Sequence, residues 1–201
     1  MTYRIGWFST GRDEAARELL KIVYENIEKG EIKDSEISFV FSNRVRKEDK
    51  QSDKFFDLVE KLGIKLVCFS SRKFKPMMKK GKPERWRQLY DEEIIKRIDK
   101  FKVDLILLAG YMLILGGKIC QKYPIINLHP ALPNGPKGTW QEVIWQLIDG
   151  KAEETGAMMH LVTPELDEGP PATYCSFPIR GEPFDRYWRE WEKMPSVSAR
   201  S

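Results

Sequence analysis

The stretch VDLILLAG, residues 103–110, is apolar at every position except Asp104 and ends in a glycine. A strand that is covered on both faces carries apolar residues at consecutive positions, whereas a strand with one face in water alternates. The run is far shorter than the roughly 20 apolar residues that a membrane span needs. It therefore predicts a buried strand in a parallel sheet.

Strands and helices are expected to alternate on both sides of this stretch. Short apolar segments predict further strands at 3–8, 36–42, 65–70, 124–128, 156–163 and 172–179. Apolar residues that recur every three or four positions predict helices at 13–30, 54–63, 84–101, 139–150 and 184–194. The alternation favours an α/β fold with a Rossmann-like, open, mostly parallel sheet and helices on both faces.

The length of the chain fits a single domain. We divide its 201 residues into a domain over 1–181 and a helical or disordered C-terminal tail over 182–201. The 34 lysine and arginine residues nearly balance the 30 aspartate and glutamate residues, so nucleic acid is not an expected partner. The basic segment 71–87 is interpreted as a solvated loop leading into a helix, with an anion-binding patch as the alternative.

Cysteine usage and hydropathy predict the compartment. Cys68, Cys120 and Cys175 lie far apart and are odd in number, which favours reduced thiols over a disulfide framework or a zinc site. The N-terminus lacks the pattern of a signal peptide. We expect a cytoplasmic protein with no metal and no membrane contact. The sequence leaves the oligomeric state open, a homodimer included.

The segment INLHPALP, residues 126–133, contains the first candidates for catalysis. Asn127 and His129 are two positions apart, so in a strand their side chains project from the same face. An amide can donate to a developing oxyanion, and an imidazole can transfer a proton near neutral pH. The acidic loop PELDEGPP, residues 164–171, supplies Asp167 as a group that could orient the imidazole. Each residue alone also has a purely structural interpretation, and the spacing does not link Asp167 to His129.

Several motifs together resemble the folate-dependent formyltransferases, and most closely their purine-synthesis branch. The family's Asn-x-His-Pro motif stands at 127–130, its Leu-Asp-x-Gly-Pro motif at 166–170, and its Thr-Gly…His strand at 155–160. VFSNR at 40–44 resembles the second strand of the purine enzyme. The resemblance is strong over 103–180 and moderate over 36–70.

The resemblance implies transfer of a formyl group from 10-formyltetrahydrofolate to a small-molecule amine. Glycinamide ribonucleotide is the acceptor that the purine-synthesis branch implies. Asn127 would hold the formyl oxygen, His129 would stabilise the same charge and move a proton, and Asp167 would favour the charged imidazole. No metal and no nucleophilic serine or cysteine is required.

The resemblance also implies binding residues. The folate pocket would be lined by Tyr111, Met112, Leu113, Ile114, Leu115, Glu165 and Leu166. The acceptor would contact Gly11, Arg12 and Pro130. For the apolar members of the folate set, plain core packing is the alternative interpretation.

The periphery of the implied site departs from the family. The first loop carries Asp13 and Glu14 where backbone amides at a helix N-terminus would grip a phosphate, although these carboxylates could instead cap the helix dipole. Leu113 stands where the purine enzyme usually has arginine. Lys137 and Trp140 stand where it has histidines. The acceptor is therefore less well predicted than the chemistry.

Other functions remain as alternatives. Within the family, the acceptor could be another amine, such as an amino sugar on a nucleotide, or water, as in a formyltetrahydrofolate hydrolase. A folate- or nucleotide-binding protein without turnover is the alternative from another class. Methionyl-tRNA is disfavoured because no second domain and no one-sided basic surface is evident. A dinucleotide oxidoreductase is disfavoured because the first loop lacks G-x-G-x-x-G.

Overall fold

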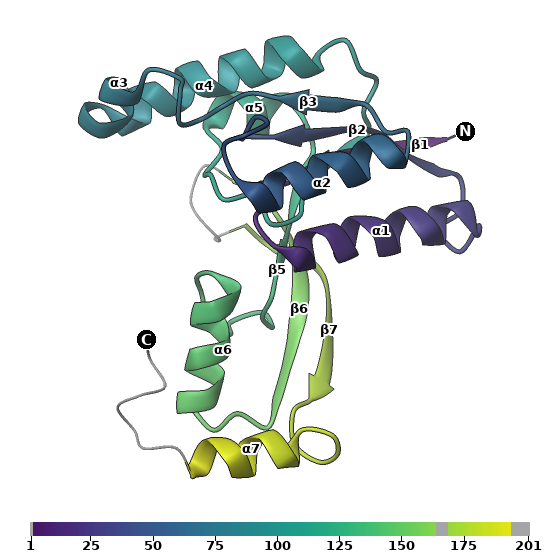
Figure 1. Cartoon of the computed structure of the whole chain (residues 1–201), viewed down its shortest axis with the longest axis vertical. Coiled ribbons are helices and arrows are strands. Elements are labelled where there is room, and N and C mark those ends of the chain that lie inside the picture. Colours follow the sequence, from purple (N-terminus) through teal and green to yellow (C-terminus); the bar gives the residue numbers. More distant parts are fainter. Residues whose placement is uncertain (1, 164–168, 194–201) are drawn as a thin grey trace. The chain divides into compact units, whose positions relative to one another are not determined.

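The computed structural model describes residues 2–163 and 169–193. Its first elements are β1 (Tyr3–Phe8), α1 (Glu14–Glu28), β2 (Ser35–Ser42), α2 (Lys50–Lys61), β3 (Leu66–Cys68), α3 (Pro76–Gly81), α4 (Pro83–Ile98) and β4 (Leu105–Leu108). They are followed by α5 (Gly117–Lys122), β5 (Ile125–His129), α6 (Trp140–Asp149), β6 (Glu154–Leu161), β7 (Pro171–Pro178) and α7 (Asp185–Glu192). All strands and helices expected from the sequence are present (Figure 1).

The strands form one seven-stranded sheet in the order β3-β2-β1-β4-β5-β6-β7. The four pairings from β3 to β5 are all parallel. β6 and β7 pair antiparallel, since Leu161 N donates to Pro170 O and Ile179 N donates to Glu153 O. The predicted fold, an open and mostly parallel sheet, is confirmed. The VDLILLAG stretch forms β4, which lies between β1 and β5.

The chain forms two compact units. The first contains Met1–Leu128 and His160–Pro170, and the second contains His129–Met159 and Pro171–Ser201. The chain passes from the first unit to the second inside β5 and returns to the first inside β6.

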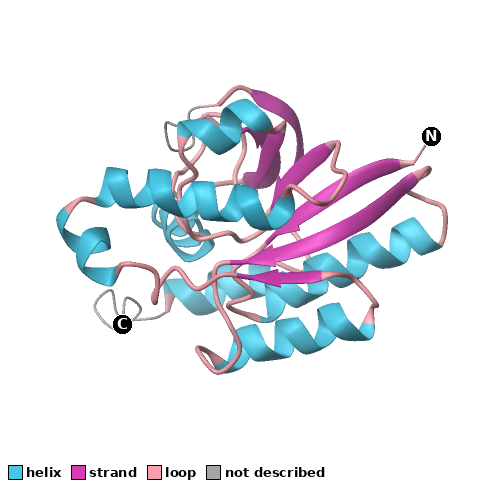
Figure 2. Cartoon of the chain, turned by 90° about the horizontal axis from the view of Figure 1, so that it is seen from above, coloured by secondary structure: helices cyan, strands magenta, loops and turns pink. Residues whose placement is uncertain are grey.

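Two apolar layers cover the sheet of the first unit. On one face, side chains from α1 and α2 pack on Trp7 and Val40; this layer includes Leu20, Phe55, Phe56 and Val59. On the other face, α4 and α5 pack on Phe8, Phe39 and Phe41; this layer includes Tyr90, Ile94, Ile98 and Ile119. Figures 1 and 2 show these helices on opposite sides of the strands. Successive side chains of β1 and β2 therefore enter different layers, which explains why Trp7–Phe8 and Phe39–Phe41 are apolar at consecutive positions.

The structure adds two short helices to the predicted elements. α3 lies within the basic segment 71–87, which was expected to be a loop, and α5 follows the AGYMLIL stretch. Each has six residues, so neither is long enough to give a repeating apolar pattern. Both are short enough to depend on tertiary contacts for stability.

The second unit is built from α6, α7 and the strands β6 and β7. α6 begins with a capping box, in which Thr139 and Glu142 each accept a hydrogen bond from the other's backbone N–H. Trp188 of α7 is buried and donates from Nε1 to Ile179 O at 2.5 Å. A pocket of about 220 Å³ lies among the apolar side chains of this unit, which include Leu147, Phe184 and Trp191. α7 agrees with the helix expected at 184–194.

Candidate active site

The carboxyl ends of the parallel strands are aligned in one row across the first unit. Phe8 of β1 is the register partner of both Phe41 and Leu108, and Leu108 is in turn the partner of Asn127. The loops that follow β1, β2 and β4 all begin just beyond this row. In open α/β sheets this edge is where ligands bind. Asn127 therefore lies at the edge where the sequence predicted it.

Asn127 is held by a second histidine. Its Nδ2 lies 3.0 Å from Nε2 of His160, and Nδ1 of His160 lies 3.0 Å from Leu161 O. A carbonyl only accepts, so Nδ1 of His160 carries a proton, and in the neutral ring Nε2 accepts from the amide of Asn127. This contact orients the amide and uses only one of its two N–H groups. The second N–H is available for a ligand oxygen.

His129 is buried and is also fixed by a carbonyl. Its Nε2 lies 2.9 Å from Pro136 O, within the second unit. Because the carbonyl can only accept, Nε2 carries a proton, and Nδ1 is the acceptor nitrogen of the neutral ring. Pro130, predicted to contact the acceptor, follows at the end of β5 and is partly buried.

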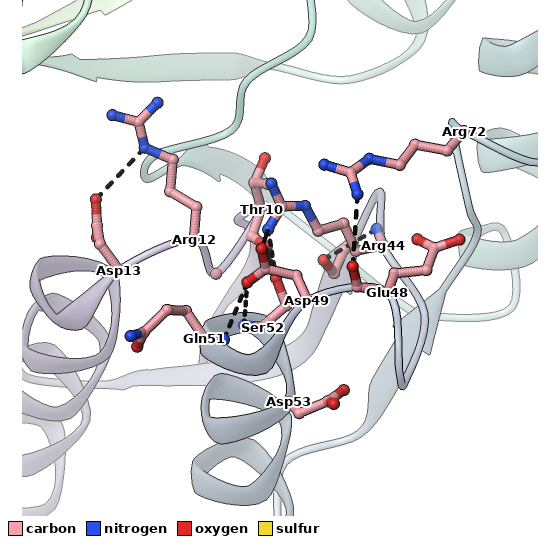
Figure 3. A network of polar contacts seen from close by, with 12 residues as sticks. Thr10, Arg12, Asp13, Arg44, Glu48, Asp49, Gln51, Ser52, Asp53 and Arg72 are labelled. Atoms are coloured by element: carbon pink, nitrogen blue, oxygen red, sulfur yellow. Dashed lines mark hydrogen bonds and ion pairs between the residues drawn. The ribbon is translucent and has the colours of Figure 1, made fainter.

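The first loop, residues 9–14, caps the N-terminus of α1 with one of its own carboxylates. Asp13 is the N-cap residue and accepts from Ala16 N at 3.0 Å. Arg12 Nε lies 3.4 Å from the Asp13 carboxylate, and Arg12 Nη1 lies 3.3 Å from Met112 Sδ (Figure 3 shows the ion pair). Gly11 has φ +63° and packs on Phe55, so a side chain there would clash. The capping interpretation of Asp13 is confirmed.

A network of buried polar side chains links the loops after β1 and β2. The Thr10 hydroxyl donates to Asn43 Oδ1 at 2.8 Å, and Ser52 Oγ donates to Thr10 O at 3.0 Å. Arg44 pairs with Asp49 at 3.1 Å, and Asp49 caps α2 (Figure 3). The N-termini of both α1 and α2 are thus capped by carboxylates of the chain itself, and each carboxylate is paired with an arginine.

The loop after β4 contains five residues predicted to line the folate pocket. Tyr111 and Leu115 are buried in the core layer beside α4. Leu113 packs partly on the same layer, Ile114 is half-buried and Met112 is 42% exposed. The core-packing alternative therefore describes Tyr111, Leu115 and in part Leu113, and Met112 is the most exposed of the five residues.

A buried carboxylate lies at the far end of this loop. Asp91 of α4 is 1% exposed, and its Oδ2 accepts from Gly116 N at 2.5 Å. Burial raises the pKa of Asp91 to about 7, although the Gly116 N–H and the nearby Arg87 act in the opposite direction. Gly116 is the N-cap of α5, which has no side-chain cap of its own.

Some residues of this polar edge were predicted from the sequence and others were not. Asp167, Glu165 and Leu166 lie outside the described residues. Thr10, Asn43 and Asp91 were not singled out by the sequence. Asn43 could have been found, because VFSNR ends an apolar strand in polar residues at the ligand-binding edge. Asp91 gives no such signal, since it lies in a helix rich in charged residues.

Two features are absent from residues 2–163 and 169–193. No group of three or more His, Cys, Asp or Glu side chains is placed there so that it could hold a metal ion. None of the helices in that part combines the length and the apolar character that a bilayer span requires.

The sheet order and the polar side chains at the carboxyl ends of its parallel strands define an open, Rossmann-like α/β protein. The family model described as "Formyl transferase" matches residues 13–182, and the chain belongs to this family. The match begins after Gly11 and Arg12, so these two residues of the first loop are outside it, whereas Asp13 and Glu14 are inside it.

Two relatives and one solved structure give the range of similarity. Phosphoribosylglycinamide formyltransferase from Schizosaccharomyces pombe is 37% identical over 111 residues, or 52% of this chain and 54% of the relative. The enzyme of that name from Escherichia coli is 36% identical over 95 residues, or 46% of this chain and 44% of the relative. This chain thus spans about half the length of the curated relatives it matches.

Glycinamide ribonucleotide transformylase 1 from Symbiobacterium toebii has a similar structure, with a TM-score of 0.70 at 22% identity. The match covers 94% of this chain and 80% of the other. At this level of identity the likeness establishes the fold.

Proposed function

We propose that this protein transfers a formyl group from 10-formyltetrahydrofolate to a primary amine, with glycinamide ribonucleotide as the acceptor. Membership of the formyl transferase family supports the reaction, and the names of the relatives support the acceptor. The observation that carries the proposal is the Asn127 amide, fixed by His160 at the carboxyl end of β5 with one N–H left for a ligand.

In the proposed reaction the amine nitrogen attacks the formyl carbon, and the formyl oxygen becomes an oxyanion. The free N–H of Asn127 donates to this oxyanion. When the intermediate collapses, the bond from the formyl carbon to N10 of the folate breaks. The proton that the amine loses passes to N10, and tetrahydrofolate and the formylated amine leave.

His129 is proposed to stabilise the oxyanion and to help move this proton. The Pro136 carbonyl fixes the orientation of its ring, which supports a defined role for each nitrogen. Asp167 is proposed to favour the charged imidazole and to order a proton-carrying water.

The folate is proposed to bind along residues 112–114 with Glu165 and Leu166, and Tyr111 and Leu115 anchor this loop from the core. Arg12, Gly11 and Pro130 are proposed to contact the acceptor. Arg12 lies against both Asp13 and Met112, which supports a position beside the folate loop.

One observation favours a different acceptor. The Asp13 carboxylate occupies the N-terminus of α1, where an acceptor phosphate would otherwise bind. An amine without a phosphate at this position, such as an amino sugar linked to a nucleotide, is therefore the second candidate acceptor.

The test is to incubate the protein with 10-formyltetrahydrofolate and a panel of amines and to measure the release of tetrahydrofolate. Asn127→Ala should lower kcat about 100- to 1,000-fold, as loss of an oxyanion donor does in other enzymes. Asn26→Ala, which removes a surface amide on α1, is the matched control. Release without any amine would identify a hydrolase. Activity that survives in both Asn127→Ala and His129→Ala would contradict the mechanism.

A cytoplasmic location and a homodimeric state are also proposals. The three cysteines lie far apart in the sequence and are odd in number, which supports a reducing compartment, and burial raises the pKa of Cys68 to about 12. Light scattering on the purified protein would determine the oligomeric state.

A further inference from the structure

The loop between β4 and α5, residues 110–116, has few backbone constraints of its own. Among the described residues, none of Leu113, Ile114 and Leu115 takes part in a backbone–backbone hydrogen bond. The loop is nevertheless anchored at both ends by side chains from other elements. Thr10 binds its first residues and Asp91 binds its last.

Thr10 fixes the start of the loop in two ways. Its backbone N–H donates to Gly110 O at 3.1 Å, and its Oγ1 accepts from Met112 N at 2.9 Å. A hydroxyl has a single proton, and that proton is donated to Asn43 Oδ1. The directions of these two side-chain hydrogen bonds are therefore fixed: Met112 N donates to Thr10, and Thr10 donates to Asn43. The side chain is 1% exposed, so water cannot replace Thr10 without repacking.

Asp91 fixes the end of the loop. Its carboxylate accepts from Gly116 N and so also caps α5, which begins at the next residue. A Cβ at position 116 would lie 2.4 Å from Asp91 Oδ2, so the contact requires glycine there. Without a carboxylate, the N–H of Gly116 would be buried with no partner, which is costly.

Tyr111 and Leu115 are buried between these two anchors. The ring of Tyr111 packs on Phe8 with centroids 5.5 Å apart, and Leu115 is 2% exposed. Between these fixed points Met112 is exposed and Leu113 and Ile114 are partly exposed, so residues 112–114 can contact a ligand.

We propose that Thr10 and Asp91 are positioning residues that hold residues 112–114 in the conformation that receives the folate. The folate part of this inference rests on the proposed function, whereas the anchoring of the loop does not. Both residues act through backbone N–H groups, so neither needs to touch the substrate.

The test uses Thr10→Val, which keeps the shape but removes the hydroxyl, and Thr10→Ser, which restores it. Asp91→Ala removes the acceptor, and Asp91→Asn restores one acceptor oxygen. Amide hydrogen exchange at Met112 and Gly116 is measured by NMR without any folate. Exchange should be about tenfold faster at Met112 in Thr10→Val and at Gly116 in Asp91→Ala, with rescue in the conservative variants.

Tetrahydrofolate binding is then titrated by calorimetry. The Kd should rise about tenfold in Thr10→Val and recover in Thr10→Ser. Ser42→Ala is the matched control, because it removes an equally buried hydroxyl that binds Arg44 N and not the loop. Ser42→Ala should leave both readouts unchanged. Thermal unfolding of every variant checks that the fold persists.

The outcomes separate the two proposals. Unchanged exchange at Met112 in Thr10→Val and at Gly116 in Asp91→Ala would overturn the anchoring, whatever the protein binds. Faster exchange with an unchanged Kd would overturn the role in folate binding. Wild-type protein that does not bind tetrahydrofolate would overturn the proposed function, while the exchange rates would still decide the anchoring.

Discussion

Asp91 is a single residue that should give the protein a measurable pH dependence of stability. Burial raises its pKa from 3.8 to about 7 in the folded protein. The folded state therefore binds this proton more tightly than the unfolded state. The resulting stability is fully present below about pH 4 and is lost as the pH rises through about 7. The full difference corresponds to roughly 4 kcal/mol.

Denaturant unfolding of the wild type and Asp91→Asn at pH 5 and pH 8 would measure the larger part of this effect, since the contribution declines from about pH 4 and is gone above about pH 7. The wild type should lose more stability than the variant between the two values. The groups facing Asp91 are Arg87, Tyr90 and Tyr111, and only Arg87 is charged over this range. An equal pH dependence in both proteins would contradict the prediction.

Individual residues were predictable where their chemistry is rare. Asn127 and His129 stand out because an amide and one of only two histidines end an apolar strand. The partners that orient them were not predictable, since Pro136 contributes only its backbone carbonyl. His160 belonged to a recognised motif, but its contact with Asn127 spans 33 positions and depends on the sheet.

At the scale of elements, the N-terminus of α1 gives a prediction about the acceptor. Asp13→Ala should destabilise the protein by about 1 kcal/mol, because the helix loses its cap. Asp13→Ser should keep the cap and remove the negative charge. Glycinamide ribonucleotide should then bind more tightly to Asp13→Ser than to the wild type, as measured by calorimetry.

Asp49→Ser is the matched control for this experiment, since it makes the same change at the N-cap of α2. If both variants tighten binding equally, the effect is one of overall charge.

Arg12→Ala tests whether the cation of the same loop contacts the acceptor. Equal affinities of the wild type and Arg12→Ala for glycinamide ribonucleotide would remove Arg12 from the acceptor site.

The long elements were predictable because they repeat. α1 and α2 are amphipathic over three turns or more, α4 buries apolar side chains at a spacing of four residues, and β4 is a continuous apolar run. α3 and α5 were missed because six residues cannot show a helical period. The end of β3 at Cys68, earlier than expected, follows from its pairing with only three residues of β2.

For the whole molecule, the division into two units predicts that damage to one core stays local. Trp188→Ala should destabilise the second unit by about 3 kcal/mol, because it removes a buried indole and its hydrogen bond to Ile179 O. Hydrogen exchange should accelerate in α6 and α7 and stay unchanged in β1 and β2. Trp140→Ala, on the exposed side of α6, is the control. Equal acceleration in β1 would contradict the prediction.

The sequence alone determined the α/β fold, the parallel sheet and the Asn127–His129 pair. These follow from local signals, namely runs of apolar residues, helical periodicity and a short motif at a strand end. The tertiary structure decided which histidine orients Asn127 and which side chains anchor the loop at 110–116. Those contacts join residues up to 102 positions apart. They depend on strand order and helix packing, and no local pattern in the sequence encodes either.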